Sequence, residues 1–450
     1  MSVAPPVLVR RLPLALLLEY RRSMLSVIER ARDLGDVVTI GLSRRLRPIC
    51  VFDPDLVEQV LVTRAGRYGK NTPGYERLSD LLGQGLLTSQ GALWKRQRRI
   101  SQPLFKKASI ARFGEIMSEE AEASAARWAR AAAGGETFDA AFDMGQLALS
   151  VVGRALFSSD LRDATERMSE ALEDSLTAYV ARLTTPLPGF QHLPTRTNRR
   201  GAAARRWLRG FVAELVRDRR ASGRQPEPPD LLALLTRAGD AEGGISEELL
   251  QDECLTMLLA GHETTANALA WSHLLLARNP EARARLEEEV DEVLDPGRAA
   301  GVEDLERLPY TWQVLQEAMR LYPPAWVIAR SVEEDDELGC YPLRAGEFVL
   351  LCQHAIHRHP KLWREPAAFR PERFAPGGER SELPRFAYFP FGGGQRLCLG
   401  EAFAKQEAVI ALATLARRFR LELLDASEPE LVASVTLRPR HGVRARVLPR

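Results

Sequence analysis

One cysteine near the end of the chain restricts the possible folds more than any other residue. Cys398 lies in the segment Phe-Gly-Gly-Gly-Gln-Arg-Leu-Cys-Leu-Gly, which spans positions 391–400. A thiolate is a strong ligand for soft metal ions, and consecutive glycines let the backbone approach a large flat group. Helix-forming residues follow from Ala402 to Ala408, so backbone N–H groups and a helix dipole would stabilise the thiolate. The segment predicts a metal-binding thiolate loop; the alternative is a buried free cysteine beside a turn.

Composition places the chain among ordinary globular proteins. Of its 450 residues, 45% are hydrophobic and 27% are charged, and the net charge of +2 gives no electrostatic case for binding nucleic acid. Five cysteines without CxxC spacing favour a reducing compartment without disulfides, so we expect a cytoplasmic protein. The apolar run from Leu12 to Leu18 is too short to span a membrane. We expect a first helix packed on the body, although contact with a membrane surface is the alternative.

Helical patterns dominate the chain, and the strand-like runs are short. We therefore expect a mainly α fold with a small β region (α+β), built as a single domain over residues 1–450 without a fused reductase. The predicted helices cover residues 115–134, 163–183, 199–220, 246–278, 281–294 and 308–321, and the predicted strands are Val37–Gly41, Ile49–Phe52 and Phe348–Cys352.

The cysteine loop resembles the heme-binding signature of the cytochrome P450 family, Phe-x-x-Gly-x-Arg-x-Cys-x-Gly. Every fixed position of that signature is present, and the resemblance extends across nearly the whole chain. It implies a triangular helical prism around buried heme b (iron protoporphyrin IX), with Cys398 as the axial iron ligand. The loop residues implied to contact the cofactor are Phe391, Gly392, Arg396 and Gly400. An axial thiolate favours O–O cleavage, so the resemblance implies a monooxygenase that hydroxylates or epoxidises its substrate with dioxygen.

A second motif, Ala-Gly-His-Glu-Thr-Thr at 260–265, lies inside the long predicted helix. Thr264 can donate its hydroxyl hydrogen to the carbonyl of Ala260 and open or bend the helix. Alone, this stretch could be a small-residue patch for helix packing. By resemblance, Thr264 and Glu263 are the alcohol–acid pair that delivers protons during oxygen activation, and Ala260 and Gly261 lie over the heme.

Two further sets of residues gain meaning from the resemblance. Glu317 and Arg320 share a helix face, and with Arg373 they match the family network that holds the cysteine loop. Trp94 and Arg98 also share a helix face and suit a heme propionate, although an exposed basic helix is the alternative. Arg330 and Arg396 are further propionate candidates by the same resemblance.

A basic cluster surrounds this propionate motif. The chain contains neither a Gly-x-Gly-x-x-Gly fingerprint nor an iron–sulfur ligand set. We therefore expect electrons from another protein, namely a ferredoxin or flavodoxin with its reductase. Such donors are typically acidic, and complementary charge speeds the encounter. The alternative is a solvated basic face. The cluster consists of Lys95, Arg96, Arg99, Lys106 and Lys107.

The substrate is predicted to be lipophilic, because the segments that usually line the family's pocket are apolar here. We expect Leu87, Ala325, Val327 and Leu437 to face the substrate, although each could equally be a core residue. A fatty acid, terpenoid, steroid or polyketide would suit such a lining. A basic cluster at Arg44, Arg45 and Arg47 has two interpretations: an anchor for a substrate carboxylate, or a solvated cluster, which is the stronger interpretation.

Two competing functions remain open from the sequence. A peroxide-driven heme hydroxylase would keep the cofactor and change the oxidant, but enzymes of that kind usually lack the acid–alcohol pair. A heme-binding sensor or carrier without turnover would not need an intact oxygen-activation helix. Both are therefore disfavoured by Glu263 and Thr264.

Overall fold

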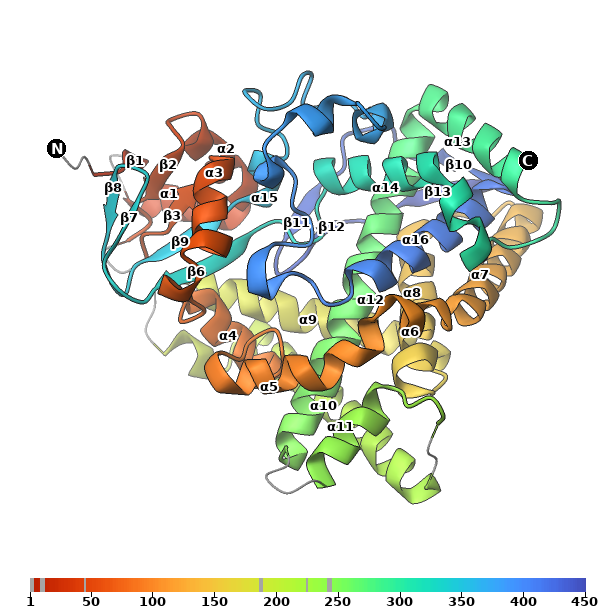
Figure 1. Ribbon diagram of the computed structural model, residues 1–450, viewed down its shortest axis with the longest axis horizontal. Helices are drawn as coiled ribbons and strands as arrows, with labels where there is room; N and C mark the ends of the chain where they lie inside the picture. The colour runs from red at the N-terminus through yellow and green to blue at the C-terminus, as the bar shows by residue number, and fades with distance from the viewer. Residues whose placement is uncertain (1–3, 9–12, 44–45, 186–188, 224–225, 241–244) are drawn as a thin grey trace.

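The computed structural model describes residues 4–8, 13–43, 46–185, 189–223, 226–240 and 245–450 (Figure 1). The six-stranded sheet lies at the left of this view, and helices α7 and α13 lie at the opposite side. A long helix, α12, crosses the space between them and packs against α8, α10, α14 and α16. The expected mainly α fold with a small β region is confirmed.

Sixteen α-helices are present in the described part of the chain. They are α1 (Pro13–Arg22), α2 (Met24–Arg32), α3 (Pro54–Glu58), α4 (Pro73–Leu82), α5 (Gly91–Ser101), α6 (Lys107–Ala111), α7 (Gly114–Gly134), α8 (Ala140–Phe157), α9 (Thr165–Thr184), α10 (Arg196–Ser222), α11 (Leu231–Asp240), α12 (Glu247–Arg278), α13 (Pro280–Val293), α14 (Pro309–Leu321), α15 (Gln353–Ile356) and α16 (Glu401–Ala416). The six helices predicted by range correspond to α7, α9, α10, α12, α13 and α14.

Four small sheets complete the described fold. The largest has the strand order β1-β2-β3-β9-β6-β4, and the others pair β10-β13-β5, β11-β12 and β7-β8. The three predicted strands are β2, β3 and β9, which are neighbours in the largest sheet. The strands are β1 (Val7–Leu8), β2 (Val37–Ile40), β3 (Ile49–Val51), β4 (Tyr68–Gly69), β5 (Phe138–Asp139), β6 (Ile328–Val332), β7 (Asp336–Leu338), β8 (Tyr341–Leu343), β9 (Phe348–Leu351), β10 (Phe419–Leu423), β11 (Leu431–Ala433), β12 (Leu437–Pro439) and β13 (Arg444–Pro449).

Helix α12 is the axis on which the site is built. Its 32 residues extend about 48 Å. Ser246 caps its first turn by accepting a hydrogen bond from the Leu249 amide at 3.2 Å. Most of its side chains are buried, because α8 and α10 cover it on one side and α14 and α16 on another. A helix covered in this way needs no polar stripe.

A glycine sets how closely α12 approaches α8. A Cβ added at Gly261 would lie 2.9 Å from a methyl carbon of Val152 on α8, which is closer than carbon atoms pack. The two helices therefore need Gly261 for their contact, and α8 in turn forms part of the wall around the site.

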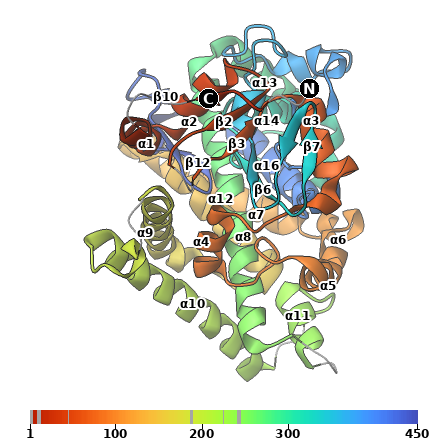
Figure 2. The ribbon, with the colours of Figure 1, turned by 90° about the vertical axis from the view of Figure 1, so that its left-hand side faces the viewer.

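Helices α9 and α10 pack on each other and stand beside α4, away from the large sheet (Figure 2). No helix in the described residues is long and apolar enough to cross a membrane. Arg44, Arg45 and Leu12, which were singled out in the sequence, lie outside the described residues.

Candidate functional site

The cysteine loop is a tight turn that ends at the start of α16. The Cys398 amide donates to the carbonyl of Phe391 at 3.0 Å, which closes the loop. Gly394 has a φ of +64°, a conformation that favours glycine. A Cβ at Gly394 would also collide with the carbonyl oxygen of Leu61. Both constraints explain why glycine is needed at this position of the loop.

The sequence predicts that the loop stabilises the Cys398 thiolate, but the pKa of this thiol is raised in the structure. The backbone N–H groups of Gly400 and Glu401 donate toward Cys398, and Arg98 adds positive charge, so all three favour the thiolate. Burial nevertheless outweighs them and raises the pKa of the Cys398 thiol. The loop alone therefore favours the neutral thiol over the thiolate. A metal cation on the sulfur would supply the missing stabilisation, because a coordinated thiol is deprotonated.

The residues before the loop are fixed to the body by hydrogen bonds. The amide of Phe389 donates to Nε2 of His357 at 3.0 Å, and its carbonyl accepts from Gln353 at 2.6 Å. Tyr388 donates its hydroxyl hydrogen to the carbonyl of Gln316 on α14 at 3.0 Å. These contacts connect the loop to α14 and α15.

The structure brings Glu317, Arg320 and Arg373 together in the core. Glu317 accepts two hydrogen bonds from Arg320, at 2.7 and 2.8 Å, and one from Arg373 at 3.3 Å. Arg320 also donates to the carbonyls of His357, Pro366 and Ala368. These hydrogen bonds join α14 to the meandering segment that leads into the cysteine loop. The geometry of the three residues therefore suits a structural role.

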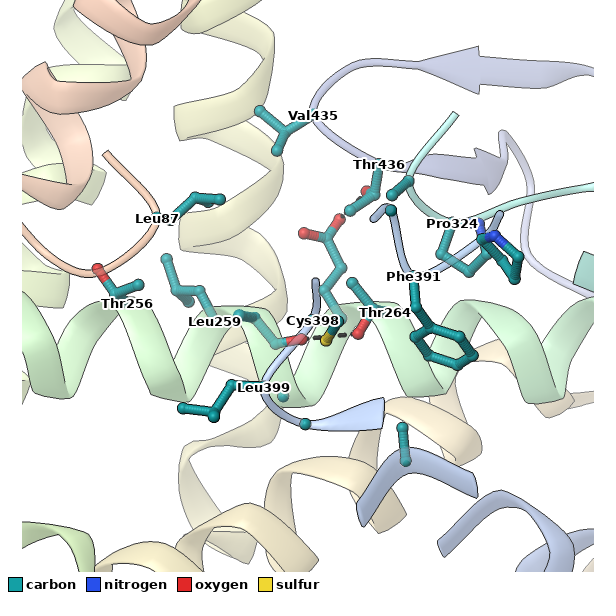
Figure 3. Close-up of a pocket in the computed structure, with 18 of the residues that line it drawn as sticks. Leu87, Thr256, Leu259, Thr264, Pro324, Phe391, Cys398, Leu399, Val435 and Thr436 are labelled. Atoms are coloured by element: carbon teal, nitrogen blue, oxygen red, sulfur yellow. Dashed lines mark hydrogen bonds between the residues drawn. The ribbon is translucent and has the colours of Figure 1, made fainter. Parts of the chain in front are cut away.

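A cavity of about 450 Å³ separates the cysteine loop from α12 (Figure 3). Leu87, Ala325 and Val327 line it as expected from the sequence, together with Cys398 and Thr264. Other walls come from α4, α8 and α9.

Leu437 does not line this cavity, contrary to the sequence expectation. Its side chain is fully buried, while Ser434, Val435 and Thr436 of the same segment form the wall. The Ser434 amide donates to the Thr436 carbonyl at 3.0 Å. This turn sets the cavity-facing side chains at the tip and leaves Leu437 in the strand behind it.

Thr264 and Glu263 make different contacts although they are neighbours on α12. The Thr264 hydroxyl donates to the carbonyl of Ala260 at 2.7 Å, the bond anticipated from the sequence, but α12 remains a continuous helix. Glu263 accepts a hydrogen bond from Thr436 at 2.6 Å. Burial raises the pKa of Glu263, and the Thr436 hydrogen bond and the charge of Arg438 oppose this rise. The carboxyl therefore holds its proton to a higher pH than an exposed glutamate.

Four basic side chains meet at one edge of the cavity. Arg98, Arg330 and Arg396 were predicted there, and Lys70 joins them. The guanidinium of Arg396 lies 3.9 Å from the ring centre of Trp94, which explains the place of the tryptophan.

The hydrogen bonds of these cations are made to neutral oxygens. Lys70 donates to the carbonyl of Leu87, and Arg98, Arg330 and Arg396 donate to the carbonyls of Leu397, Ala329 and Ser89. No ion pair with a carboxylate in the described residues involves any of the four. One nitrogen of Arg396 is buried without a hydrogen-bond partner.

Burial and mutual repulsion both favour an anion at this edge. Burial and the charge of Arg330 lower the pKa of Arg396 to about 10. Burial, Arg330 and Arg396 lower the pKa of Lys70 well below its usual range. The two propionates of a porphyrin would reverse this repulsion. With Cys398 opposite α12, the donor set fits heme b, with Arg98, Arg330, Arg396 and Lys70 at the propionates.

Two residues of the site, Lys70 and Thr436, were not predicted from the sequence. Lys70 precedes a proline-initiated helix, and no local pattern marks it, because its role depends on distant arginines. Thr436 precedes Leu437, which was predicted to face the substrate, but no sequence pattern indicates a partner for the Thr436 hydroxyl. Only the approach of the β11–β12 hairpin to α12 reveals its partner.

The basic cluster lies on α5, α6 and the turn between them. Lys95, Arg99, Lys106 and Lys107 are exposed, and Arg96 is partly buried. Phe105 from the same turn packs edge-on against Phe403 of α16 at 6.3 Å, so the cluster lies beside the helix that follows Cys398. Arg47 is exposed and does not line the described cavity.

Comparisons with known proteins agree with this geometry. The Cytochrome P450 family model matches residues 5–442. A cyclooctatin synthase from Streptomyces melanosporofaciens is 38% identical, over 90% of this chain and 87% of the relative. A cyclooctat-9-en-7-ol 5-monooxygenase from the same organism is 35% identical, over 86% and 83%. A pentalenene oxygenase from Streptomyces avermitilis is 32% identical, over 92% and 91%.

Proposed function

Because the chain belongs to the cytochrome P450 family, whose cofactor is heme b, we propose that it hydroxylates a neutral cyclic terpenoid. Its activity is that of an oxidoreductase of the monooxygenase class. When bound, the heme supplies the activation of dioxygen, and the protein supplies ligation, orientation and protons. The substrate class and the roles of individual residues are the proposal.

The observation that carries the substrate proposal is the apolar wall of the cavity. Leucines from four helices line it, and its described cations all gather at the propionate edge or near the cysteine loop. A charged substrate would lose its hydration without gaining a counter-ion, so a neutral molecule fits best. The leucines are Leu78, Leu81, Leu82, Leu156, Leu172, Leu176 and Leu259.

The names of the relatives favour terpenoids among the lipophilic substrates. Two of them are named for cyclooctat-9-en-7-ol and pentalenene, which are cyclic terpenoid compounds. The matches cover most of both chains. A fatty acid fits less well, because Arg47, a candidate for its carboxylate, lies outside the cavity lining.

A binding titration tests this proposal. Pentalenene, cyclooctat-9-en-7-ol and dodecanoic acid are added separately to the oxidised heme protein, and the low-spin to high-spin shift is recorded. We expect saturable shifts with the cyclic compounds and none with the acid. A shift with dodecanoic acid alone would contradict the terpenoid assignment. Leu87→Glu should abolish the shifts by placing a charge on the wall, whereas Leu424→Glu on the surface should not.

We also propose that Glu263 and Thr264 deliver protons during turnover. Their position beside the cavity supports this role, and the raised pKa of Glu263 agrees with it, because the buried carboxyl holds its proton to a higher pH than an exposed glutamate does. Thr264→Ala and Glu263→Gln should divert reducing equivalents from product to peroxide. If peroxide alone supports the full rate and neither variant changes it, the enzyme is a peroxide-driven hydroxylase instead.

A separate electron donor is part of the proposal. The exposed lysines of α5 and α6 lie beside α16, so an acidic ferredoxin or flavodoxin docked there would approach the cysteine side of the heme. Lys106→Glu with Lys107→Glu should slow reduction and weaken its salt dependence. Arg444→Glu, on the exposed face of β13, is the matched control. Equal effects of the two changes would remove this surface from the proposal.

We propose a single domain in a reducing, cytoplasmic environment. Buried residues from Leu16 to Val447 form one hydrophobic cluster, which supports the single domain. All five cysteines are free, as expected where disulfides do not form. Limited proteolysis should release no stable fragment from the heme protein if the unit is single.

A further inference from the structure

The hydrogen bond between Glu263 and Thr436 joins two distant parts of the chain. Thr436 Oγ1 donates to Glu263 Oε1 at 2.6 Å, across 173 positions of sequence. The hydroxyl of Thr264 is meanwhile directed to the carbonyl of Ala260. The acid and the alcohol of the proposed relay are therefore engaged with different partners. In the described residues, no hydrogen bond joins the Glu263 carboxyl to the Thr264 hydroxyl.

The hairpin that carries Thr436 is a fixed support. The indole N–H of Trp271 donates to the carbonyl of Leu437 at 3.1 Å, and that of Trp326 donates to the carbonyl of Ser434 at 2.9 Å. The Leu437 amide also donates to the carbonyl of Pro324 at 2.9 Å. Both tryptophans are buried. The tip between β11 and β12 is thus held on both flanks of Thr436.

The same tip forms part of the cavity wall. Val435 and Thr436 both line the cavity (Figure 3). Thr436 is 5% exposed, so bulk water does not compete for its hydroxyl. The hydrogen bond is partly buried, so it is stronger than the same pair in water.

We propose that Thr436 is a positioning residue, whose hydroxyl holds the Glu263 carboxyl at the hairpin and away from Thr264 in the resting enzyme. Proton delivery then requires the carboxyl to break this hydrogen bond. The bond slows futile proton transfer when no substrate is present. This inference rests on the proposed role of Glu263 as the acid.

Burial raises the pKa of Glu263, and the hydrogen bond from Thr436 opposes this rise. Because the Thr436 hydroxyl donates, it stabilises the ionised carboxylate more than the neutral acid. Removal of the hydroxyl should therefore leave a carboxyl that is more readily protonated and free to turn. Serine at this position keeps the donor, whereas valine keeps the shape and loses it.

The test compares Thr436→Val with Thr436→Ser in the heme-loaded protein. Infrared spectroscopy follows the carboxyl band that Glu263→Gln removes, which requires no turnover and no substrate. Oxidation of NADPH through a ferredoxin and its reductase is measured without substrate, in H₂O and in D₂O. The carbon monoxide difference spectrum verifies that each variant holds its heme.

We expect the valine variant to shift the Glu263 band and to raise substrate-free NADPH oxidation about two- to tenfold, the range that one net hydrogen bond gives. Its solvent isotope effect should fall, and the serine variant should match the wild type. In the Glu263→Gln background, Thr436→Val should add nothing.

Three results would overturn the inference. The Glu263 infrared band could stay unshifted in Thr436→Val, or it could shift while substrate-free NADPH oxidation stays unchanged. Thr436→Ser could also behave like Thr436→Val. If Glu263→Gln itself leaves oxidation and the isotope effect unchanged, the relay role of Glu263 fails as well. The infrared comparison would still decide whether Thr436 holds the carboxyl.

Discussion

The buried Glu317 network offers the sharpest test of what holds the cysteine loop. Glu317→Gln keeps the shape of the side chain and removes its charge. The carboxylate accepts hydrogen bonds from Arg320, Arg373 and the amide of Arg370. Glu317 and Arg320 are fully buried, so water cannot replace the lost charge. The glutamine NH₂ group would also face a guanidinium donor.

The expected loss can be estimated from this burial. Removal of one partner of a buried ion pair costs about 3–5 kcal/mol. Arg320 keeps three carbonyl acceptors, so we expect a value near the lower end, about 3 kcal/mol. Glu170→Gln is the matched control, because Glu170 pairs with Arg167 three positions away at 2.8 Å and both side chains are exposed. Its loss should be about 0.2–1 kcal/mol.

Urea unfolding of the heme-loaded protein measures both losses. With a slope of about 3 kcal/mol per M, the Glu317→Gln midpoint should fall by about 1 M. The Soret band, which reports heme release, and the far-ultraviolet circular dichroism should both show the change. Equal midpoints for Glu317→Gln and Glu170→Gln would refute the argument that burial gives this network its strength.

Three further outcomes are expected. Gly394→Ala should reduce heme retention, since a Cβ would meet the carbonyl of Leu61 in a strained conformation; spectra of heme content unchanged from the wild type would contradict this. Cys398→Ala should abolish the thiolate-type carbon monoxide spectrum and Cys254→Ala should not, because Cys254 is buried outside the cavity lining. Burial raises the pKa of Glu253 from 4.5 to about 7. Between these pH values the folded state binds a proton that the unfolded state has lost, so the free energy of unfolding should fall as the pH rises from 4.5 to about 7. Glu253→Gln should flatten that fall in pH-dependent thermal melts, and an unchanged slope would rule the group out.

The helices predicted from the sequence lie within three residues of the structure at each end, including the largely buried α12, but α8 was missed. The ranges for α7 and α14 lie within one residue of the structure, because breakers flank a periodic apolar face. The buried helix α8 was not predicted. Nearly all of its residues are covered, so its sequence lacks the polar stripe by which a surface helix is recognised.

The candidate site shows the same division between local and tertiary information. Cys398, Arg396 and Gly394 belong to one short motif that fixes their spacing in the sequence. Lys70 acquires its meaning only beside arginines that lie hundreds of positions away. Thr436 is similar, since the turn at the hairpin tip decides which side chain faces α12. A pattern along the chain cannot encode such contacts.

The four cations at the cavity edge make the stability of the polypeptide depend on cofactor supply. Without an anion they repel one another, and burial together with this repulsion lowers the pKa values of Lys70 and Arg396. A ligand that binds only the folded state stabilises it by mass action. A cell short of porphyrin would therefore hold more of this chain unfolded and exposed to proteases. Heme availability would set the abundance of the enzyme as well as its activity.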